Sequence, residues 1–261
     1  MKDLVITCIQ TDLVWEDKIA NLSHFESLFQ DLPEATMVVV LPEMFATGFS
    51  MQPQKLAEPM DGTLVFWMRT QANRLRKIIT GSVIIEEDGR YFNRLIWMQP
   101  DGKSYYYDKK HLFGFAGEDA HYTAGDRRVI VSVNGWKINL QVCYDLRFPV
   151  WARQNAAQGG YYDVLLYVAN WPHRRVLAWD TLLQARAVEN QCYVVGVNRI
   201  GNDGNGIYHN GSSAIIDPWG THLWHCDGAS SFHTQTLSYQ TLKDVREKLP
   251  FLNDGDKFLL L

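Results

Sequence analysis

Cys143 lies at the end of an apolar, β-rich stretch, where the pattern changes from strand to helix. Runs 129–133 and 136–142 precede it, and Pro149 opens a helix-like run over 150–158, because proline suits a first helical turn. A thiol at such a turn is lifted out of the sheet and lies near backbone N–H groups, as a nucleophile requires. Free cysteine is also often buried, so a structural role is the alternative from this segment alone.

Two other segments carry groups that could cooperate with this thiol. Glu43 follows the apolar run 38–41 and a proline, and Lys109 lies in the segment 107–113. Amide hydrolysis needs a nucleophile, a base, donors for an oxyanion and an acid for the leaving nitrogen. A free thiol, with a pKa of about 8.5, is mostly protonated at neutral pH, so an adjacent base is useful. Glu43 is the candidate base, whereas Lys109 by itself would be assigned to a solvated loop.

Together the three segments resemble the signature blocks of the nitrilase, or carbon–nitrogen hydrolase, superfamily. The family pattern has a Glu after a strand and a proline, a Lys in Tyr-x-Lys-x-His-Leu-Phe, and a Cys in Cys-Tyr-Asp-x-Arg-Phe. Here these blocks are centred on Glu43, Lys109 and Cys143, in the family's order and with its spacing. The resemblance extends from about residue 4 to about residue 237, and it is closest to the short bacterial ω-amidases.

The resemblance implies a role for each of these groups. Cys143 would attack the amide, and Glu43 would take the thiol proton, return it to ammonia and then activate water. Lys109 and the backbone N–H of Tyr144 would hold the oxyanion. Lys110 is a rival for the lysine role, although the motif register favours Lys109.

The family also has a second glutamate that contacts the lysine and helps to orient the substrate. Its position in this chain is Glu118, nine residues after Lys109. Asp119 is the alternative, and an ordinary surface acid is the other interpretation of Glu118. The implied reaction uses only thiol, carboxylate and ammonium groups, so we expect no cofactor and no metal.

The cysteine block resembles ω-amidases more than nitrilases, which implies short acids with a terminal amide as substrates. Examples are 2-oxoglutaramate and 2-oxosuccinamate, which would give a dicarboxylate and ammonia. The far carboxylate requires a cation, and Arg174 and Arg175 are candidates, whereas Arg147 is expected in a structural ion pair. Trp171 follows a buried strand and could wall the pocket or simply pack. The alternative functions are an N-carbamoyl-amide or aliphatic amide hydrolase, and a catalytically silent binding protein.

Several other features are predicted to have no catalytic role. Arg186 and Glu189 can pair on one helix face, which indicates a structural role, for example at a subunit interface. His111 lacks an obvious orienting Asp or Asn, so a Cys–His pair is not favoured. The run 222–226 contains metal-ligand types, but strand alternation separates them, and the turn 201–206 lacks a phosphate-loop pattern.

The composition is typical of a globular protein and excludes several classes. Of 261 residues, 46% are hydrophobic and 21% charged, the net charge is −4, and basic runs do not exceed two residues. Nucleic-acid binding is therefore not predicted. No segment approaches the roughly 18 apolar residues of a membrane span. The four cysteines are widely spaced and no secretory pattern is present, so we expect a reducing cytoplasm.

Strand and helix patterns alternate along the chain, which predicts an α/β fold with mixed sheets. A helix over about 17–29 should bury Ile19 and Phe25 on one face, and Thr63 is the expected N-cap of a second helix. The resemblance implies a four-layer α-β-β-α sandwich. We expect one domain over 1–261, with an extension from about 242 to 261 at a subunit interface, in a homodimer or higher homo-oligomer.

Overall fold

The computed structural model describes residues 2–154 and 161–259, and within them the strands form two mixed sheets. The six-stranded sheet has the order β13-β1-β2-β3-β4-β5, with β1–β2 and β2–β3 parallel. The other sheet has the order β10-β11-β9-β8-β7-β6, with β12 on β11 and with β7–β8 and β8–β9 parallel. The first sheet comprises β1 (Leu4–Gln10), β2 (Val38–Val40), β3 (Ile78–Glu87), β4 (Arg90–Met98), β5 (Ser104–Asp108) and β13 (Ser231–Leu237). The second comprises β6 (Ile130–Val133), β7 (Trp136–Val142), β8 (Val164–Ala169), β9 (Tyr193–Asn198), β10 (Ile200–Asn202), β11 (Tyr208–Ile216) and β12 (His222–Asp227).

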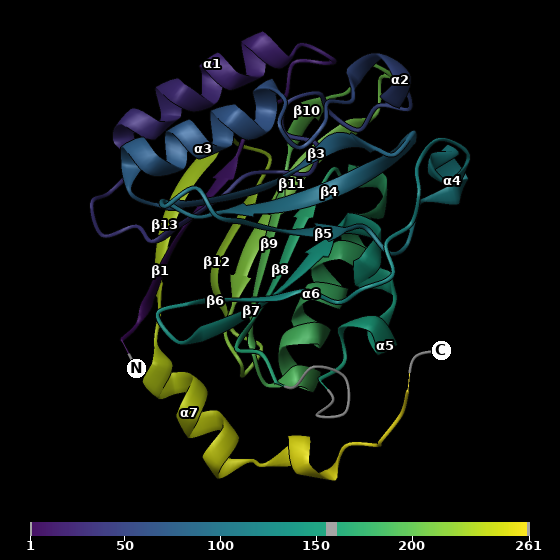
Figure 1. Cartoon of the computed structure of the whole chain (residues 1–261). Coiled ribbons are helices and arrows are strands. Elements are labelled where there is room, and N and C mark those ends of the chain that lie inside the picture. Colours follow the sequence, from purple (N-terminus) through teal and green to yellow (C-terminus); the bar gives the residue numbers. More distant parts are fainter. Residues whose placement is uncertain (1, 155–160, 260–261) are drawn as a thin grey trace.

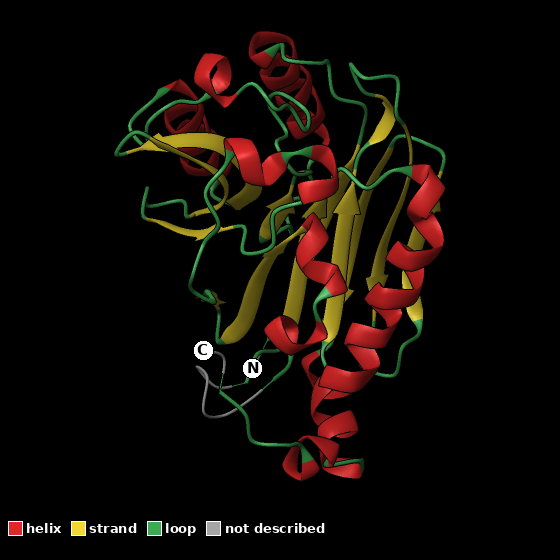
Figure 2. Cartoon of the chain, turned by 90° about the vertical axis from the view of Figure 1, so that its right-hand side faces the viewer, coloured by secondary structure: helices red, strands yellow, loops and turns green. Residues whose placement is uncertain are grey.

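Helices cover the outer faces of the two sheets. α1 and α3 lie on one side of the molecule and α6 on the other, as Figures 1 and 2 show from two directions. The longer helices are α1 (Lys18–Leu28), α3 (Thr63–Leu75), α6 (Val176–Asn190) and α7 (Tyr239–Lys248). The short ones are α2 (Pro53–Leu56), α4 (Glu118–His121) and α5 (Pro149–Ala152). This is the predicted four-layer α-β-β-α sandwich.

Alternation along the strands creates separate cores. In β2, Val38 and Val40 belong to the cluster that contains Ile138 and Leu140 of β7, so these side chains fill the space between the sheets. Val39, between them, packs instead with apolar residues of α1 and α3. A third cluster joins the outer face of the second sheet to α6. Both sheets are therefore covered on both faces, which explains the continuous apolar runs in their parallel strands.

Three predicted elements differ in detail from the structure. Ile19 is 83% exposed, because α1 buries Asn21 and Phe25 on its packed face. The helix α3 has Gly62, not Thr63, at its N-cap. The helix predicted over 150–158 is only α5, because the backbone is already extended at residue 153, and 155–160 lie outside the described residues.

The carboxyl ends of β2, β5, β7 and β8 carry the residues of the candidate site. β2 and β5 run in the same direction in the first sheet, because β3 is parallel to β2 and two antiparallel steps lead from β3 to β5. β7 and β8 are parallel in the second sheet. The carboxyl ends of such strands are where ligand-binding residues collect in α/β proteins. Glu43, Lys109, Cys143 and Asn170 each lie within three residues of one of these ends.

Candidate active site

Cys143 lies at the point where β7 ends and the 3₁₀ turn η3 (Cys143–Arg147) begins. Its backbone is left-handed, with φ of 43°, an uncommon conformation for a residue other than glycine. Met44, directly after Glu43, is also left-handed, with φ of 44°, and its N–H donates to the Ser82 hydroxyl at 2.8 Å. Strained backbone of this kind persists only where the surrounding structure holds it, and it is enriched at functional sites.

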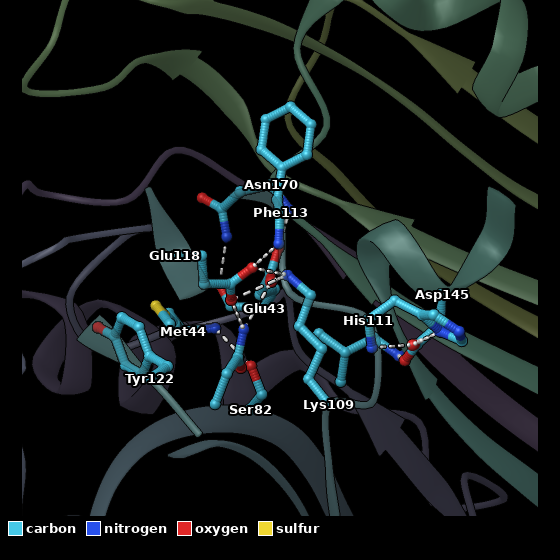
Figure 3. Close-up of polar contacts among 12 residues, drawn as sticks. Glu43, Met44, Ser82, Lys109, His111, Phe113, Glu118, Tyr122, Asp145 and Asn170 are labelled. Carbon is cyan, nitrogen blue, oxygen red and sulfur yellow. Dashed lines mark hydrogen bonds and ion pairs between the residues drawn. The ribbon is translucent and has the colours of Figure 1, made fainter. Parts of the chain in front are cut away.

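Glu43, Lys109 and Glu118 form a group with fully buried side chains, which we call the buried cluster. The Lys109 ammonium lies 3.0 Å from Oε1 of Glu43 and 2.8 Å from Oε2 of Glu118. Figure 3 shows the three side chains pointing toward one another from separate segments. Lys110 lies instead with its ammonium 5.6 Å from the ring centre of Trp151, and Asp119 is exposed.

The cluster shifts the pKa of its own members. Burial would lower the pKa of Lys109, but the neighbouring carboxylates Glu118 and Glu43 raise it above its ordinary value. Burial raises the pKa of Glu118, and Glu43 adds to this, while Lys109 opposes it. One ammonium thus faces two carboxylates in a site without water exposure, and it stays protonated.

The Cys143 thiol lies close enough to the Glu43 carboxylate for the two groups to interact. Desolvation and then the charge of Glu43 raise the pKa of the thiol well above its ordinary value, while Lys109 acts in the opposite direction. The sulfur is therefore held as a thiol rather than as a thiolate at neutral pH. Such a group becomes an effective nucleophile only when an adjacent base accepts its proton during the attack.

Two asparagines that we did not predict hold Glu43 in place. The Asn93 side chain donates to Glu43 Oε1 at 2.7 Å, and the backbone N–H of Asn170 donates to Glu43 Oε2 at 2.8 Å. Glu118 is fixed by the backbone N–H of Phe113 at 2.6 Å. The signals were present in the sequence, because Asn93 is a polar residue inside an apolar strand and Asn170 follows a buried strand.

His111 does have an orienting acid, so the expectation that it lacks one was wrong. Oδ1 of Asp145 lies 2.8 Å from the His111 ring Nδ1 and accepts the His111 backbone N–H at 3.0 Å. The pair is seen to the right of the cluster in Figure 3. The Cys143 thiol, by contrast, interacts with Glu43.

A cavity of about 240 Å³ opens beside Cys143 and the buried cluster. Three arginines line it, namely Arg147, Arg174 and Arg175, and we call them the arginine group. The Arg147 guanidinium lies 4.9 Å from the ring centre of Trp171, which also lines the cavity. Arg147 forms no ion pair with a described acid, so the expectation of a structural ion pair was wrong. Among the described residues, no acid forms an ion pair with the arginine group.

The arginine group is crowded with positive charge. Burial lowers the pKa of Arg175, and repulsion from Arg174 and Arg147 lowers it further. The Arg175 guanidinium also packs 4.9 Å from the ring centre of Phe113. A bound anion in this cavity would relieve the repulsion, because opposite charge stabilises the protonated guanidinium.

Other predicted groups lie near the site but serve the scaffold. Arg186 and Glu189 pair at 3.0 Å on α6, as predicted, and Arg186 also donates to the Leu146 carbonyl at 2.6 Å. The second contact links α6 to the turn that carries Cys143.

In the described part of the chain, no helix is long and apolar enough to cross a membrane.

Fold and site thus define a hydrolase of the kind that the three signature blocks indicate. The family model for carbon–nitrogen hydrolases matches residues 5–247, and the chain belongs to that family. This confirms the predicted resemblance.

Two relatives and two solved structures illustrate what the chain is similar to. The chain is 45% identical to an ω-amidase, YafV, of Yersinia enterocolitica, over the full length of both, and 30% identical to a 2-oxoglutaramate amidase of Bacillus subtilis, over 97% and 98% of the two chains. Among solved structures, XC1258 of Xanthomonas campestris superposes with a TM-score of 0.97 at 44% identity, over the full length of both. It is described as a CN-hydrolase superfamily protein with an arsenic adduct in its active site. Nit3 of Saccharomyces cerevisiae, a nitrilase superfamily member, superposes with a TM-score of 0.84 at 25% identity, over 95% of both chains.

Proposed function

We propose that this protein is a thiol amidohydrolase that converts short ω-amido acids, such as 2-oxoglutaramate and 2-oxosuccinamate, to dicarboxylates and ammonia. The observation that carries the proposal is a cavity lined by the Cys143 thiol, by the Lys109 ammonium with its paired Glu43 carboxylate, and by three arginines. The first set suits cleavage of an amide, and the second suits recognition of a carboxylate. The full-length relatives with ω-amidase and 2-oxoglutaramate amidase activity in their names support the same substrate class.

In the first half of the reaction, the Cys143 sulfur attacks the amide carbon while its proton passes to Glu43. The carbonyl oxygen becomes an oxyanion, which the Lys109 ammonium and the backbone N–H of Tyr144 stabilise. When the carbon–nitrogen bond breaks, Glu43 returns the proton to the nitrogen and ammonia leaves. The product of this half is a thioester on Cys143.

In the second half, water attacks the thioester. Glu43 takes a proton from the water, a second oxyanion forms in the same place, and the carbon–sulfur bond breaks. The sulfur recovers its proton from Glu43, and the new carboxylate leaves. Glu118 holds the Lys109 ammonium at 2.8 Å throughout and orients the amide, as the family pattern implies.

The arginine group binds the carboxylate at the other end of the substrate. Arg174 and Arg175 remain the principal candidates, and Arg147 joins them because it lines the same cavity. Trp171, two residues after the end of β8, lines the same cavity beside Arg147. A guanidinium can bind a carboxylate through two parallel hydrogen bonds, which gives orientation as well as affinity.

We further propose that the chain is a single domain that forms a homodimer. Leu242 and Val245 of α7 are buried against their own chain, so the part of the extension that is free to meet a partner follows this helix. It exposes Phe251 and Leu259, which line a cleft together with Val150 of α5. Exposed apolar side chains that share a cleft are typical of a surface covered in an assembly, and a second copy is the occupant we expect.

A cytoplasmic location fits the chemistry of the nucleophile. All four cysteines are free, although Cys8 and Cys192 are buried. Cys143 is the one whose function depends on remaining a free thiol. A reducing compartment preserves such a thiol without further protection.

Release of ammonia from 2-oxoglutaramate by wild type and by Cys143→Ala tests the function. We expect turnover by wild type and none by the variant, with N-carbamoyl amino acids hydrolysed far more slowly. Turnover of carbamoyl compounds but not of ω-amides would contradict the substrate class. Equal activity of Cys143→Ala would contradict the nucleophile.

A further inference from the structure

Asp145 is a fully buried carboxylate that no step of the proposed reaction uses. It accepts four hydrogen bonds, two on each oxygen. Oδ1 accepts the backbone N–H of His111 at 3.0 Å and lies 2.8 Å from its ring Nδ1. Oδ2 accepts the Tyr107 hydroxyl at 2.7 Å and the backbone N–H of Val142 at 3.0 Å. A carboxylate with four donors is fully satisfied, so its position is tightly determined.

These donors come from two different sheets. Tyr107 is in β5 of the first sheet, and His111 follows it, so the two flank Lys109 two residues away on either side. Val142 ends β7 of the second sheet and directly precedes Cys143. Asp145 therefore ties the segment that carries the lysine to the turn that carries the nucleophile.

The surroundings make this connection rigid. The Tyr107 hydroxyl also accepts the indole N–H of Trp151 at 2.9 Å and the backbone N–H of Lys110 at 3.2 Å. The His111 ring stacks on Phe148, with ring centres 3.8 Å apart and planes 7° apart. Tyr107 and His111 are thus each held by a further contact, which leaves the carboxylate little freedom to move.

The proposed oxyanion donors are on the two segments that Asp145 joins. The Lys109 ammonium comes from the first segment, and the Tyr144 N–H lies in the turn after Cys143. Two donors stabilise one oxyanion only when their separation is held to within a few tenths of an ångström. We infer that Asp145 is a positioning residue, which holds these two segments in register and so sets the geometry of the oxyanion hole.

The inference rests on the proposed function, and Asp145→Asn tests it. The amide keeps the size of the carboxylate but has a single acceptor oxygen, so it cannot serve both segments. We expect kcat for succinamate, a short ω-amido acid, to fall about 100-fold, as when one oxyanion donor is lost, with KM almost unchanged. The matched control is Asp163→Asn, directly before β8, where the carboxylate accepts the Lys137 N–H at the start of β7 at 2.9 Å. This control should leave kcat unchanged.

Alkylation of Cys143 by iodoacetamide separates positioning from a loosened fold. This displacement forms a carbon–sulfur bond and expels iodide, and no charge develops on a carbonyl oxygen. We expect Asp145→Asn to be alkylated at the wild-type rate although its amide turnover falls. A parallel loss of alkylation and turnover would show a structural role only and would overturn the inference.

Two milder variants decide the matter if Asp145→Asn does not fold. Tyr107→Phe removes one donor, and His111→Phe removes another while keeping the stack on Phe148. Each should lower kcat several-fold, with KM and alkylation unchanged. Unchanged kcat in both would overturn the inference. A wild-type protein that releases no ammonia from succinamate would instead refute the proposed function itself.

Discussion

The two charged regions of the cavity are built in opposite ways. In the buried cluster, the Lys109 ammonium pairs with both Glu43 and Glu118 at distances of 2.8 to 3.0 Å, away from solvent. In the arginine group, no described acid pairs with the guanidinium groups, and they repel one another. The ion pairs of the first region are formed before a substrate arrives, whereas the second region has no ion pair with a described acid, although Asp203 lines the same cavity. This difference indicates that chemistry and recognition are divided between the two regions.

The largest expected effect comes from the buried cluster. Glu43→Gln keeps the shape of the side chain but removes the base, so we expect kcat/KM to fall by about four orders of magnitude. Circular dichroism should show an unchanged fold. Glu87→Gln, a glutamate on β3 that pairs with Arg94, is the control and should remain active. Substantial activity in Glu43→Gln would remove Glu43 as the base.

The next largest effect is a difference in the free energy of unfolding between variants of the buried cluster and variants of the arginine group. Lys109→Met leaves two buried carboxylates without their cation, so the free energy of unfolding should fall by about 3 to 5 kcal/mol. Arg174→Met removes an exposed cation that forms no ion pair with a described residue, and it should change this free energy by less than about 0.5 kcal/mol. Urea unfolding of both variants measures the contrast. Similar losses in both would mean that the arginine group is also structural.

His209 makes the stability of the cavity depend on pH. It lines the cavity and lies near Arg199. Burial, and then repulsion from Arg199, lowers its pKa from 6.5 to about 4. A lowered pKa means that this contribution to stability is complete above pH 6.5 and is lost as the pH falls toward 4. The loss should reach about 3 kcal/mol.

Urea unfolding between pH 7 and pH 4 checks this contribution. His209→Gln should lose about 3 kcal/mol less than wild type over that range, since it has no proton to gain. His173→Gln, at an exposed position, should follow the wild-type curve. Parallel curves for wild type and His209→Gln would contradict a neutral His209.

The smallest expected effect comes from single members of the arginine group. Arg175→Met should raise KM for 2-oxoglutaramate about 10- to 100-fold, as expected for loss of one charge-assisted hydrogen bond, and leave kcat nearly unchanged. Arg69→Met, at an exposed position on α3, is the control. An unchanged KM in both Arg174→Met and Arg175→Met would remove these residues from carboxylate recognition.

The sequence predicted most of the fold because its apolar runs match the strands that are buried on both faces. The predictions were less accurate for the exposed faces of helices and for the ends of helices. Ile19 has the spacing of a packed residue but lies on the solvent side of α1, because Asn21 takes a buried place through hydrogen bonds to Val14 and Ala46. Residue Arg153 ends α5 early, which helix propensity alone does not reveal.

The site was predictable where a motif carries the chemistry, and less so where the contact is tertiary. Glu43, Lys109 and Cys143 stand in recognisable blocks, and the structure brings their side chains together. Asn93 and Asp145 act through partners 50 and 34 residues away, which the local sequence does not identify. Residues that hold the reactive groups therefore required the structure.

The central claim is that the arginine group selects amides with a distant carboxylate. It is tested most directly by kcat/KM of the wild-type protein for succinamate and for butyramide, in which a methyl group replaces the carboxylate. We predict a preference for succinamate of about 100-fold or more, because a desolvated guanidinium–carboxylate pair is a strong interaction. Equal values for the two amides would contradict the account, and the protein would then be a general aliphatic amidase.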